Sequence, residues 1–345
     1  MATCYAASIP SLPTALLFLG LLMVVSTSYI TAAQAIGVCY GVLGDDLPPA
    51  NEVVDLYTRN NIERMRLYFP RDDILQALKG SNIELMLGIP NGELKNIASN
   101  DPTPSFSWVY KYVNASRNDI RFRYIAVGNE VTMAEWEYVL PAMKNIYRAL
   151  ETAGLQDQIK VSTAVFSGHI SATYPPRNSV FNSQIRPFMR EIVAFLLEKQ
   201  APLLANVYPF FAYLSNQAQI PSEYVFFTSP TVNEIGYQNL FDAMLDGFYY
   251  SLEKEGGSSL EIVVSETGWP NAGDSISTTE NAQKYYSNLI QHVNSGKATP
   301  KRPGKTIETY LFAMFDENQK DKDEREKHFG LFFPNKLPKY HIKLS

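Results

Sequence analysis

The chain has 345 residues, of which 46% are hydrophobic and 19% are charged. This composition excludes a disordered or fibrous protein and leaves enough apolar surface for one large core. The chain holds 30 Lys and Arg against 35 Asp and Glu, a net charge of −5, and carries no basic block. We therefore expect no nucleic-acid partner.

The N-terminal segment, residues 1–35, has the pattern of a secretory signal peptide. Residues 14–25 read TALLFLGLLMVV, an apolar run too short to span a bilayer, and Ala33-Gln34-Ala35 fits a small-x-small cleavage site. Cleavage after Ala33 or Ala35 leaves a mature chain that starts at Gln34 or Ile36, with one domain over residues 36–345. We expect this domain to be secreted to the extracellular space rather than sorted to the vacuole.

Cleavage of the signal peptide also decides the fate of the two cysteines. Cys4 leaves with the segment, so Cys39 has no disulfide partner, and its apolar surroundings predict a small buried side chain. The triplet that begins at Asn114 is a candidate N-glycosylation site. The C-terminal end shows no hydrophobic tail, so we expect no membrane anchor, and we expect a monomer.

Short strand-like runs alternate with longer helical patterns along the mature chain. Eight apolar or β-branched runs predict strands at residues 36–40, 62–68, 83–89, 122–128, 159–165, 203–209, 261–266 and 307–313. Apolar residues spaced three and four apart predict helices at residues 50–61, 138–154, 188–200, 239–257 and 278–296.

This alternation predicts a parallel sheet covered by helices, and eight repeats predict closure into a single (β/α)8 TIM barrel. The alternative is an open doubly wound sheet. No G-x-G-x-x-G follows the first predicted strand, so a dinucleotide-binding sheet is disfavoured.

Two of the predicted strands end on a glutamate. The run FRYIAVG leads into Asn129-Glu130, and the run EIVVS leads into Glu266. Because the carboxyl ends of barrel strands meet at one rim, we expect Glu130 and Glu266 to share a cleft. Paired carboxylates suit glycosidic bond hydrolysis. Trp269, close behind Glu266, offers a flat apolar face for a sugar ring.

The motifs around these two glutamates resemble those of the plant β-1,3-glucanases of glycoside hydrolase family 17. The stretches that carry the resemblance include IGVCYG, RMRLY, FRYIAVGNEV, LLANVYPFF, VVSETGWP and FAMFDENQK, and they extend from residue 36 to residue 340. The resemblance implies a (β/α)8 barrel and an endo-acting hydrolase of β-1,3-glucan. It also implies retention of anomeric configuration, with carboxyl groups about 5 to 5.5 Å apart.

The resemblance further implies roles for individual residues. Glu130 is expected to be the general acid and base, Glu266 the nucleophile, and Asn129 a partner of the sugar 2-hydroxyl. Arg66 is expected to orient a carboxylate through paired hydrogen bonds. The other expected substrate-binding or supporting residues are Tyr40, Tyr208, Trp269, Phe312, Glu317, Lys320 and Glu326.

The chain departs from its relatives at three places. Phe69-Pro70 follows RMRLY and predicts a more apolar cleft lining there. His169 is unusual after the fifth strand, and we interpret it as a loop residue rather than a base. The loop after Glu130 is short, which would open one end of the cleft.

Two alternatives to the β-1,3-glucanase stay open. One is a mixed-linkage β-1,3;1,4-glucanase with the same chemistry, and the other is a wall glucan-binding protein without turnover. A metal-dependent hydrolase is disfavoured because the chain has 4 His and no HExxH motif. No metal and no cofactor are expected.

Overall fold

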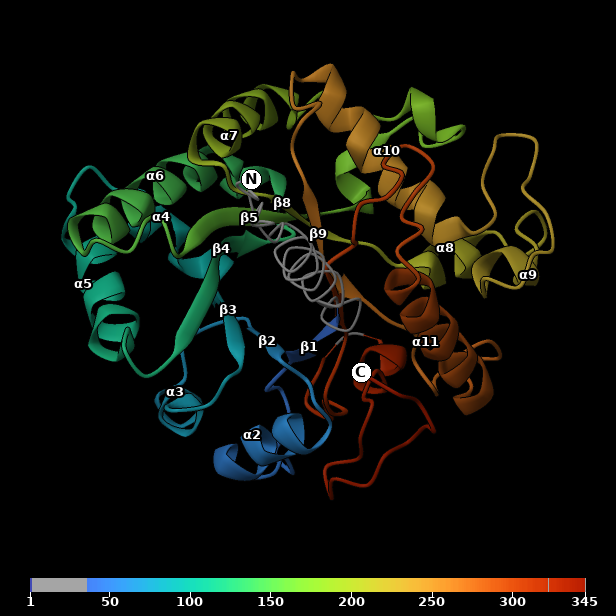
Figure 1. Cartoon of the computed structure of the whole chain (residues 1–345), viewed down its shortest axis with the longest axis horizontal. Helices are drawn as coiled ribbons and strands as arrows, with labels where there is room; N and C mark the ends of the chain where they lie inside the picture. The colour runs from blue at the N-terminus through green and yellow to red at the C-terminus, as the bar shows by residue number, and fades with distance from the viewer. Residues whose placement is uncertain (2–35, 322, 345) are drawn as a thin grey trace. The chain divides into compact units, whose positions relative to one another are not determined.

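A computed structural model describes residue 1, residues 36–321 and residues 323–344. The predicted signal peptide therefore lies, except for Met1, outside the described residues. From Ile36 onward, eight parallel strands close into a barrel in the order β1, β10, β9, β8, β5, β4, β3 and β2 (Figure 1). Their bounds are β1 Ile36–Tyr40, β2 Arg64–Leu67, β3 Glu84–Ile89, β4 Arg121–Asn129, β5 Lys160–Phe166, β8 Leu203–Asn206, β9 Ile262–Thr267 and β10 Thr309–Leu311. The (β/α)8 barrel and its eight predicted strands are confirmed.

Helices surround the barrel on its outside (Figure 1). They are α2 Ala50–Arg59, α3 Asp72–Leu78, α4 Leu94–Ile97, α5 Thr103–Tyr112, α6 Trp136–Thr152, α7 Arg186–Lys199, α8 Pro209–Ser215, α9 Ser222–Val225, α10 Leu240–Lys254 and α11 Thr279–Asn294. Each of the five predicted helices is present, and its ends lie within three residues of the prediction. In α2, for example, Val53, Val54 and Tyr57 are buried against the barrel on one face, as an amphipathic surface helix requires.

The loops also hold short elements that the sequence pattern does not predict. Strands β6 Ile170–Ser171 and β7 Val180–Phe181 form a small antiparallel sheet after β5. The 3-10 helices are η1 Asn91–Glu93, η2 Asn114–Ser116, η3 Met133–Glu135, η4 Ser167–His169, η5 Pro176–Asn178 and η6 Glu324–Lys327. Runs of two to four residues carry too little periodicity to be recognised in a sequence.

Ion pairs fill the amino-terminal end of the barrel. Arg123 donates two hydrogen bonds to Glu308, of 3.0 and 2.7 Å, and Arg64 lies 3.1 Å from Glu84. These residues stand at or near the first positions of their strands. Access to the barrel is therefore from the carboxyl ends of the strands, where active sites of this fold lie.

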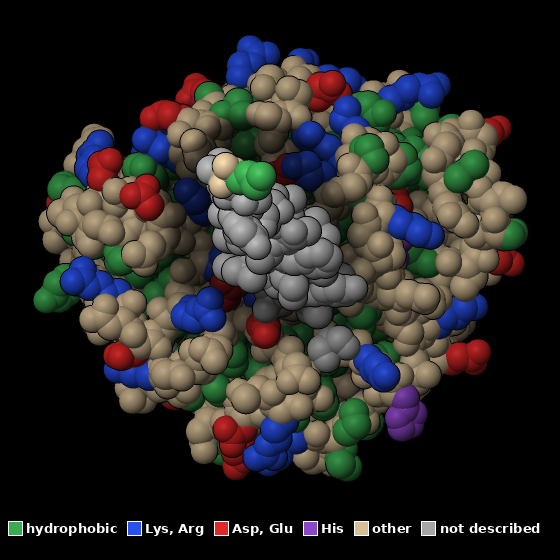
Figure 2. Space-filling view, viewed as in Figure 1, with side chains coloured by type: hydrophobic (Ala, Val, Ile, Leu, Met, Phe, Trp, Pro, Cys, Tyr) green, Lys and Arg blue, Asp and Glu red, His purple; other side chains and the backbone are tan. Residues whose placement is uncertain are grey.

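Charges of both signs are interspersed over the face of the molecule in Figure 2, where the described residues are visible. Basic and acidic side chains follow one another around this face without forming a block of one sign. Within the described part of the chain, no helix combines the length and the apolar character needed to cross a membrane.

Candidate active site

A cavity of about 830 Å³ opens at the carboxyl ends of the barrel strands. Its polar floor includes Glu130 and Glu266, and apolar side chains form much of its walls. The aromatic residues that line it are Tyr68, Phe69, Phe166, Tyr208, Phe211, Phe312 and Phe329. A cavity with a few polar groups among aromatic rings is a typical ligand-binding site.

Glu130 follows β4 and turns into this cavity through an unusual backbone. Gly128 has a φ of 75° and Glu130 itself a φ of 49°, and the pairing of β4 with β5 shifts register between Ala126 and Asn129. The Glu130 N–H donates to Ala164 O at 3.0 Å, which holds the turn against β5. A non-glycine residue in the left-handed region is uncommon and costs free energy, and such residues cluster at functional sites.

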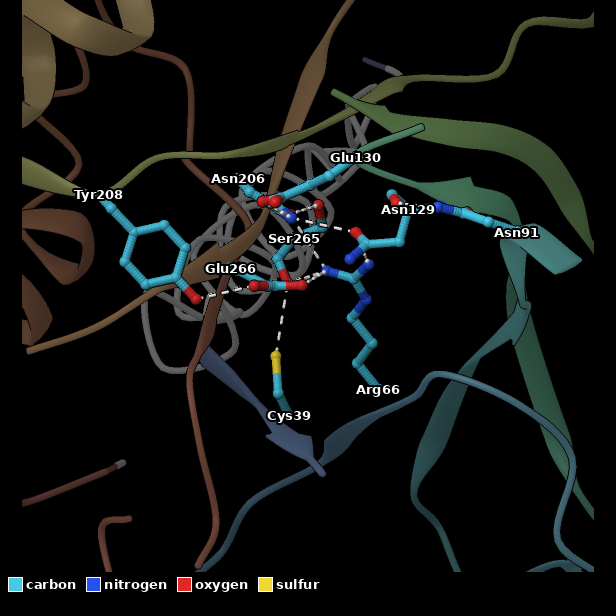
Figure 3. Close-up of polar contacts among 9 residues, drawn as sticks. All are labelled: Cys39, Arg66, Asn91, Asn129, Glu130, Asn206, Tyr208, Ser265 and Glu266. Atoms are coloured by element: carbon cyan, nitrogen blue, oxygen red, sulfur yellow. Dashed lines mark hydrogen bonds and ion pairs between the residues drawn. The ribbon is translucent and has the colours of Figure 1, made fainter. Parts of the chain in front are cut away.

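Glu266 lies in β9 and is 6% exposed. Arg66 Nη1 lies 2.9 Å from its Oε1, and the Tyr208 hydroxyl donates to its Oε2 at 2.7 Å. Both carboxylate oxygens are therefore held by hydrogen bonds from opposite sides of the group (Figure 3). Paired bonds of this kind fix the rotamer of the carboxylate and compensate for its burial.

Arg66 extends from β2 into the centre of the barrel, where it is 1% exposed. Besides Glu266, it donates to Ser265 O at 2.8 Å and, through Nη2, to Asn129 Oδ1 at 2.8 Å. Burial alone lowers the pKa of Arg66, but the neighbouring Tyr68 and Glu266 outweigh it, so the pKa of this guanidinium is raised. Arg66 therefore stays charged and joins the ends of three strands.

Asn206, the last residue of β8, joins the two glutamates and was missed in the sequence. Its Nδ2 donates to Glu130 Oε1 at 2.8 Å, and its Oδ1 accepts from Arg66 Nη1 at 3.2 Å. Because Arg66 also binds Glu266, one hydrogen-bonded network spans both carboxylates (Figure 3). The signal for Asn206 is its spacing of two residues from Tyr208 in the predicted strand 203–209, which would place both side chains on the same face.

The environment of Glu130 raises the pKa of its carboxyl group. The pKa of Glu130 is raised from 4.5 to about 7, mainly by burial and then by the negative charge of Glu266, whereas the hydrogen bond from Asn206 and the charge of Arg66 act in the opposite direction. A carboxylic acid with a pKa near neutrality can donate a proton at mildly acidic pH.

Asn129 is fixed at its backbone by Asn91 of η1. Asn91 Nδ2 donates to Asn129 O at 2.9 Å, and Asn129 N donates to Asn91 Oδ1 at 2.8 Å. Because the Asn129 side-chain oxygen accepts from Arg66, the amide NH2 group points away from Arg66, and Asn129 lines the cavity. An amide NH2 in this place can donate to a sugar hydroxyl.

The predicted supporting residues Phe312, Glu317, Lys320 and Glu326 meet along the cavity wall. Lys320 Nζ lies 3.4 Å from Glu317 Oε2, 3.3 Å from Glu326 Oε2 and 4.3 Å from the centre of the Phe312 ring. Glu317 is 4% exposed and accepts from Leu43 N at 2.9 Å. It therefore holds the loop after β1 against the segment that carries Lys320.

The prediction that Trp269 offers a face to sugar is wrong. Trp269 is 0% exposed and does not line the cavity. Its indole N–H donates to Ile276 O at 3.0 Å, and its ring packs against Phe210, Phe226 and Tyr285. Trp269 is a core residue behind β9, and an exposed aromatic ring in the lining of the cavity is instead that of Phe211 of α8, which is 37% exposed.

Tyr40 also departs from its expected place. Cys39 points into the barrel, where its Sγ lies 3.4 Å from Ser265 O, so the next residue of β1 faces outward. Tyr40 is 3% exposed, packs edge-on against Phe315 and is absent from the cavity lining. The prediction that Tyr40 reaches the catalytic centre is therefore wrong. The prediction of a buried, unpaired Cys39 is confirmed.

Three further predicted features have clear positions. Phe69 lines the cavity beside β2 and adds an apolar ring to its wall. His169 is buried in η4, where Nδ1 accepts from Phe166 N and Nε2 lies 3.1 Å from Val131 O. Asn114 is partly buried in η2, and Arg117 donates to its Oδ1 at 3.2 Å.

No three His, Cys, Asp or Glu side chains are placed to hold a metal ion in residues 36–321 and 323–344. Glu130 and Glu266 are instead joined through the network that Arg66 and Asn206 form.

Comparison with known proteins agrees with this geometry. Glycosyl hydrolases family 17 matches residues 36–344. The chain is 49% identical to the acidic isoform GI9 of glucan endo-1,3-beta-glucosidase from Nicotiana tabacum over 97% of each chain, and 51% identical to that plant's basic vacuolar isoform GLB over 96% of this chain and 90% of the relative. A solved beta-1,3-glucanase and allergen of Cryptomeria japonica pollen superimposes with a TM-score of 0.87 at 43% identity, covering 90% of this chain and 99% of that one. The chain belongs to glycosyl hydrolases family 17.

Proposed function

We propose that this protein is a retaining endo-hydrolase of internal β-1,3-glucosidic bonds, with Glu130 as general acid and base and Glu266 as nucleophile. The observation that carries the proposal is the different setting of two glutamates in one cavity. Glu130 has a pKa near 7, whereas Glu266 is held by the Arg66 guanidinium and the Tyr208 hydroxyl. Two carboxyls with separate roles are the requirement of this chemistry.

In the first step Glu130 gives its proton to the glycosidic oxygen as the bond from that oxygen to the anomeric carbon breaks. A Glu266 oxygen forms a new bond to the anomeric carbon, and the leaving sugar departs as an alcohol. Arg66 and Tyr208 hold the attacking carboxylate in one orientation, so no rotamer search precedes the attack.

In the second step Glu130, now ionised, takes a proton from water while the water oxygen attacks the anomeric carbon. The bond to Glu266 breaks, and both glutamates regain their starting states. Two inversions at the same carbon retain the configuration. Asn129, whose NH2 group points away from Arg66, is the proposed partner of the sugar 2-hydroxyl during both steps.

The substrate class rests on the relatives and on the cavity. The most similar relatives described above carry the name glucan endo-1,3-beta-glucosidase. A cavity of about 830 Å³ with rings such as Phe69 and Phe211 along it accommodates several sugar units of a chain. Callose and fungal wall glucan are polymers of this linkage. The proposed site of action is extracellular, following the signal pattern in residues 1–35.

The test is product formation from linear β-1,3-glucan and from mixed-linkage β-glucan, with Glu266→Gln as control. Oligomers from the linear glucan, with the β-anomer formed first in the NMR spectrum, are the expected result. Cleavage of the mixed-linkage polymer alone would contradict the proposed specificity and identify a mixed-linkage β-1,3;1,4-glucanase instead. Initial formation of the α-anomer would contradict a nucleophilic role for Glu266. Binding of glucan without turnover would contradict the proposed hydrolase activity.

A further inference from the structure

The side-chain amide of Asn206 contacts both halves of the active site. Asn206 is 1% exposed, and its Nδ2 donates to Glu130 Oε1 at 2.8 Å and to Asn129 Oδ1 at 3.0 Å. Its Oδ1 accepts from Ser265 Oγ at 2.8 Å and from Arg66 Nη1 at 3.2 Å. Figure 3 shows the amide between these groups.

All four contacts agree on one orientation of this amide. Arg66 can only donate, so it requires an acceptor, the Oδ1 atom, on its side of Asn206. A flipped amide would place its NH2 group against the Arg66 guanidinium and its oxygen against Asn129 Oδ1. The same guanidinium holds Asn129 Oδ1 through Nη2 at 2.8 Å. Arg66 therefore sets the direction of both amides.

The fixed amide has a consequence for the protonated form of Glu130. The N–H of Asn206 occupies Oε1, and a carboxylic acid accepts hydrogen bonds best at its carbonyl oxygen. Oε2 has no hydrogen-bond partner among residues 36–321 and 323–344, and Glu130 lines the cavity. On the proposed function above, we infer that Asn206, oriented by Arg66 and also bound by Ser265, is a positioning residue that places the catalytic proton of Glu130 on Oε2.

The orientation of the Asn206 amide matters because a flipped amide would place the Glu130 proton on Oε1, the oxygen that faces Asn206. If the amide presented its oxygen to Glu130, Oε1 would carry the proton and donate it to Asn206. The acid would then be hydrogen-bonded inside the protein rather than directed at the glycosidic oxygen. Arg66, which can only donate, raises the free energy of that flipped state, and the buried Ser265 hydroxyl adds a second hydrogen bond to Oδ1 in the observed orientation.

Asn206 also affects the ionisation of Glu130. The charged groups that act on Glu130 are Glu266 of β9, Arg66 of β2 and Glu326 of η6. The N–H of Asn206 stabilises the ionised form and thereby lowers the pKa of Glu130 relative to the value that burial would give. Loss of the Asn206 amide therefore raises the pKa of Glu130. The variant would keep Glu130 protonated to higher pH, but the proton would no longer be held on Oε2.

The test compares Asn206→Ala and Ser265→Ala with Glu130→Gln, on β-1,3-glucan and on a 2,4-dinitrophenyl β-1,3-glucoside oligomer whose leaving group needs no acid. On glucan we expect kcat/KM to fall by about 10- to 100-fold for Asn206→Ala and by roughly threefold for Ser265→Ala. On the activated substrate both losses should shrink to about threefold or less. The alkaline limb of kcat/KM should move up by about one pH unit in Asn206→Ala.

Equal losses of Asn206→Ala on both substrates, or an unmoved alkaline limb, would overturn the inference, because damage to the fold does not discriminate between leaving groups. Glu130→Gln separates this failure from failure of the proposed function. If Glu130→Gln retains kcat/KM on the activated substrate, the acid assignment stands and only the role of Asn206 is rejected. If Glu130→Gln loses equally on both substrates, the acid assignment itself is wrong. Thermal unfolding of each variant shows whether it folds. If Asn206→Ala does not fold, Ser265→Ala, which removes one side-chain oxygen, still tests the role of Asn206.

Discussion

The Tyr208 hydroxyl donates to Glu266 Oε2 at 2.7 Å, on the oxygen that Arg66 does not hold. The phenol therefore completes the alignment of the proposed nucleophile. For Tyr208→Phe we expect kcat to fall by about 10- to 100-fold, the value of a hydrogen bond to a charged group, with KM changed less than threefold. Steady-state kinetics on linear β-1,3-glucan measure both constants. A rise in KM with constant kcat would assign Tyr208 to substrate binding instead.

Glu266→Gln should abolish turnover because an amide cannot attack the anomeric carbon. The buried Arg66 would also lose its charged partner, although it keeps bonds to Ser265 O and Asn129. We therefore expect the free energy of unfolding to fall by about 1–3 kcal/mol, less than for full removal of a partner in a buried pair. Denaturant unfolding checks the loss of stability, and initial rates check the loss of activity. Residual turnover above about 1% of wild type would contradict the nucleophile assignment.

The raised pKa of Glu130 predicts the pH dependence of the enzyme. We expect kcat/KM to fall above about pH 7, tenfold per pH unit, as the acid ionises. Because the folded state binds its proton more tightly than the unfolded state, the free energy of unfolding should also fall as the pH rises from 4.5 to about 7. Both effects should disappear in Glu130→Gln. An alkaline limb that survives in this variant would belong to another group.

The sequence predicted the barrel because its strands and helices repeat with strong periodicity, and it predicted Glu130 and Glu266 because both end such strands. It could not separate Trp269 from Phe211. Both are large aromatic residues near strand ends, and only the packing of α8, α11 and their loops decides which ring is covered. The prediction for Tyr40 was wrong for a related reason. All five residues of β1 are buried, so the sequence pattern does not show which of them face the inside of the barrel.

The hydrogen-bond partners of Asn206 could not be predicted from the sequence, for a different reason. An asparagine in LLANVYP shows polarity without showing its partners, and those partners are 59 to 140 residues away along the chain. Hydrogen bonds of this kind depend on the closure of the barrel, which brings β2, β4, β8 and β9 to one point. The alternation with Tyr208 could have suggested that Asn206 points to the cleft, but not which glutamate it binds.

Trp269 and Phe211 provide a matched pair of substitutions. Trp269→Ala should cost about 3–5 kcal/mol of stability, as for other buried aromatic residues, and leave KM unchanged in the folded fraction. Phe211→Ala should instead raise KM by roughly fivefold, through loss of about 1 kcal/mol of stacking, with little change in melting temperature. Tyr110→Ala on α5, exposed and outside the cavity lining, is the control for a lost surface ring. The reverse pattern, with KM raised by Trp269→Ala alone, would restore the sequence-based interpretation.

Gly41, directly after β1, tests the contact that holds the cleft wall. A Cβ atom at this position would lie 2.2 Å from Glu317 Oε2, in the place that the carboxylate needs to accept from Leu43 N. Gly41→Ala should therefore displace Glu317 and, with it, Lys320 and the loop after β1. We expect a loss of about 1–3 kcal/mol in stability and a reduced kcat/KM on long glucans. Gly92→Ala is the matched control, because a Cβ atom there meets nothing within 4 Å. Equal effects of the two substitutions on melting temperature and kcat/KM would mean that the Glu317 carboxylate is free to move and does not hold the wall.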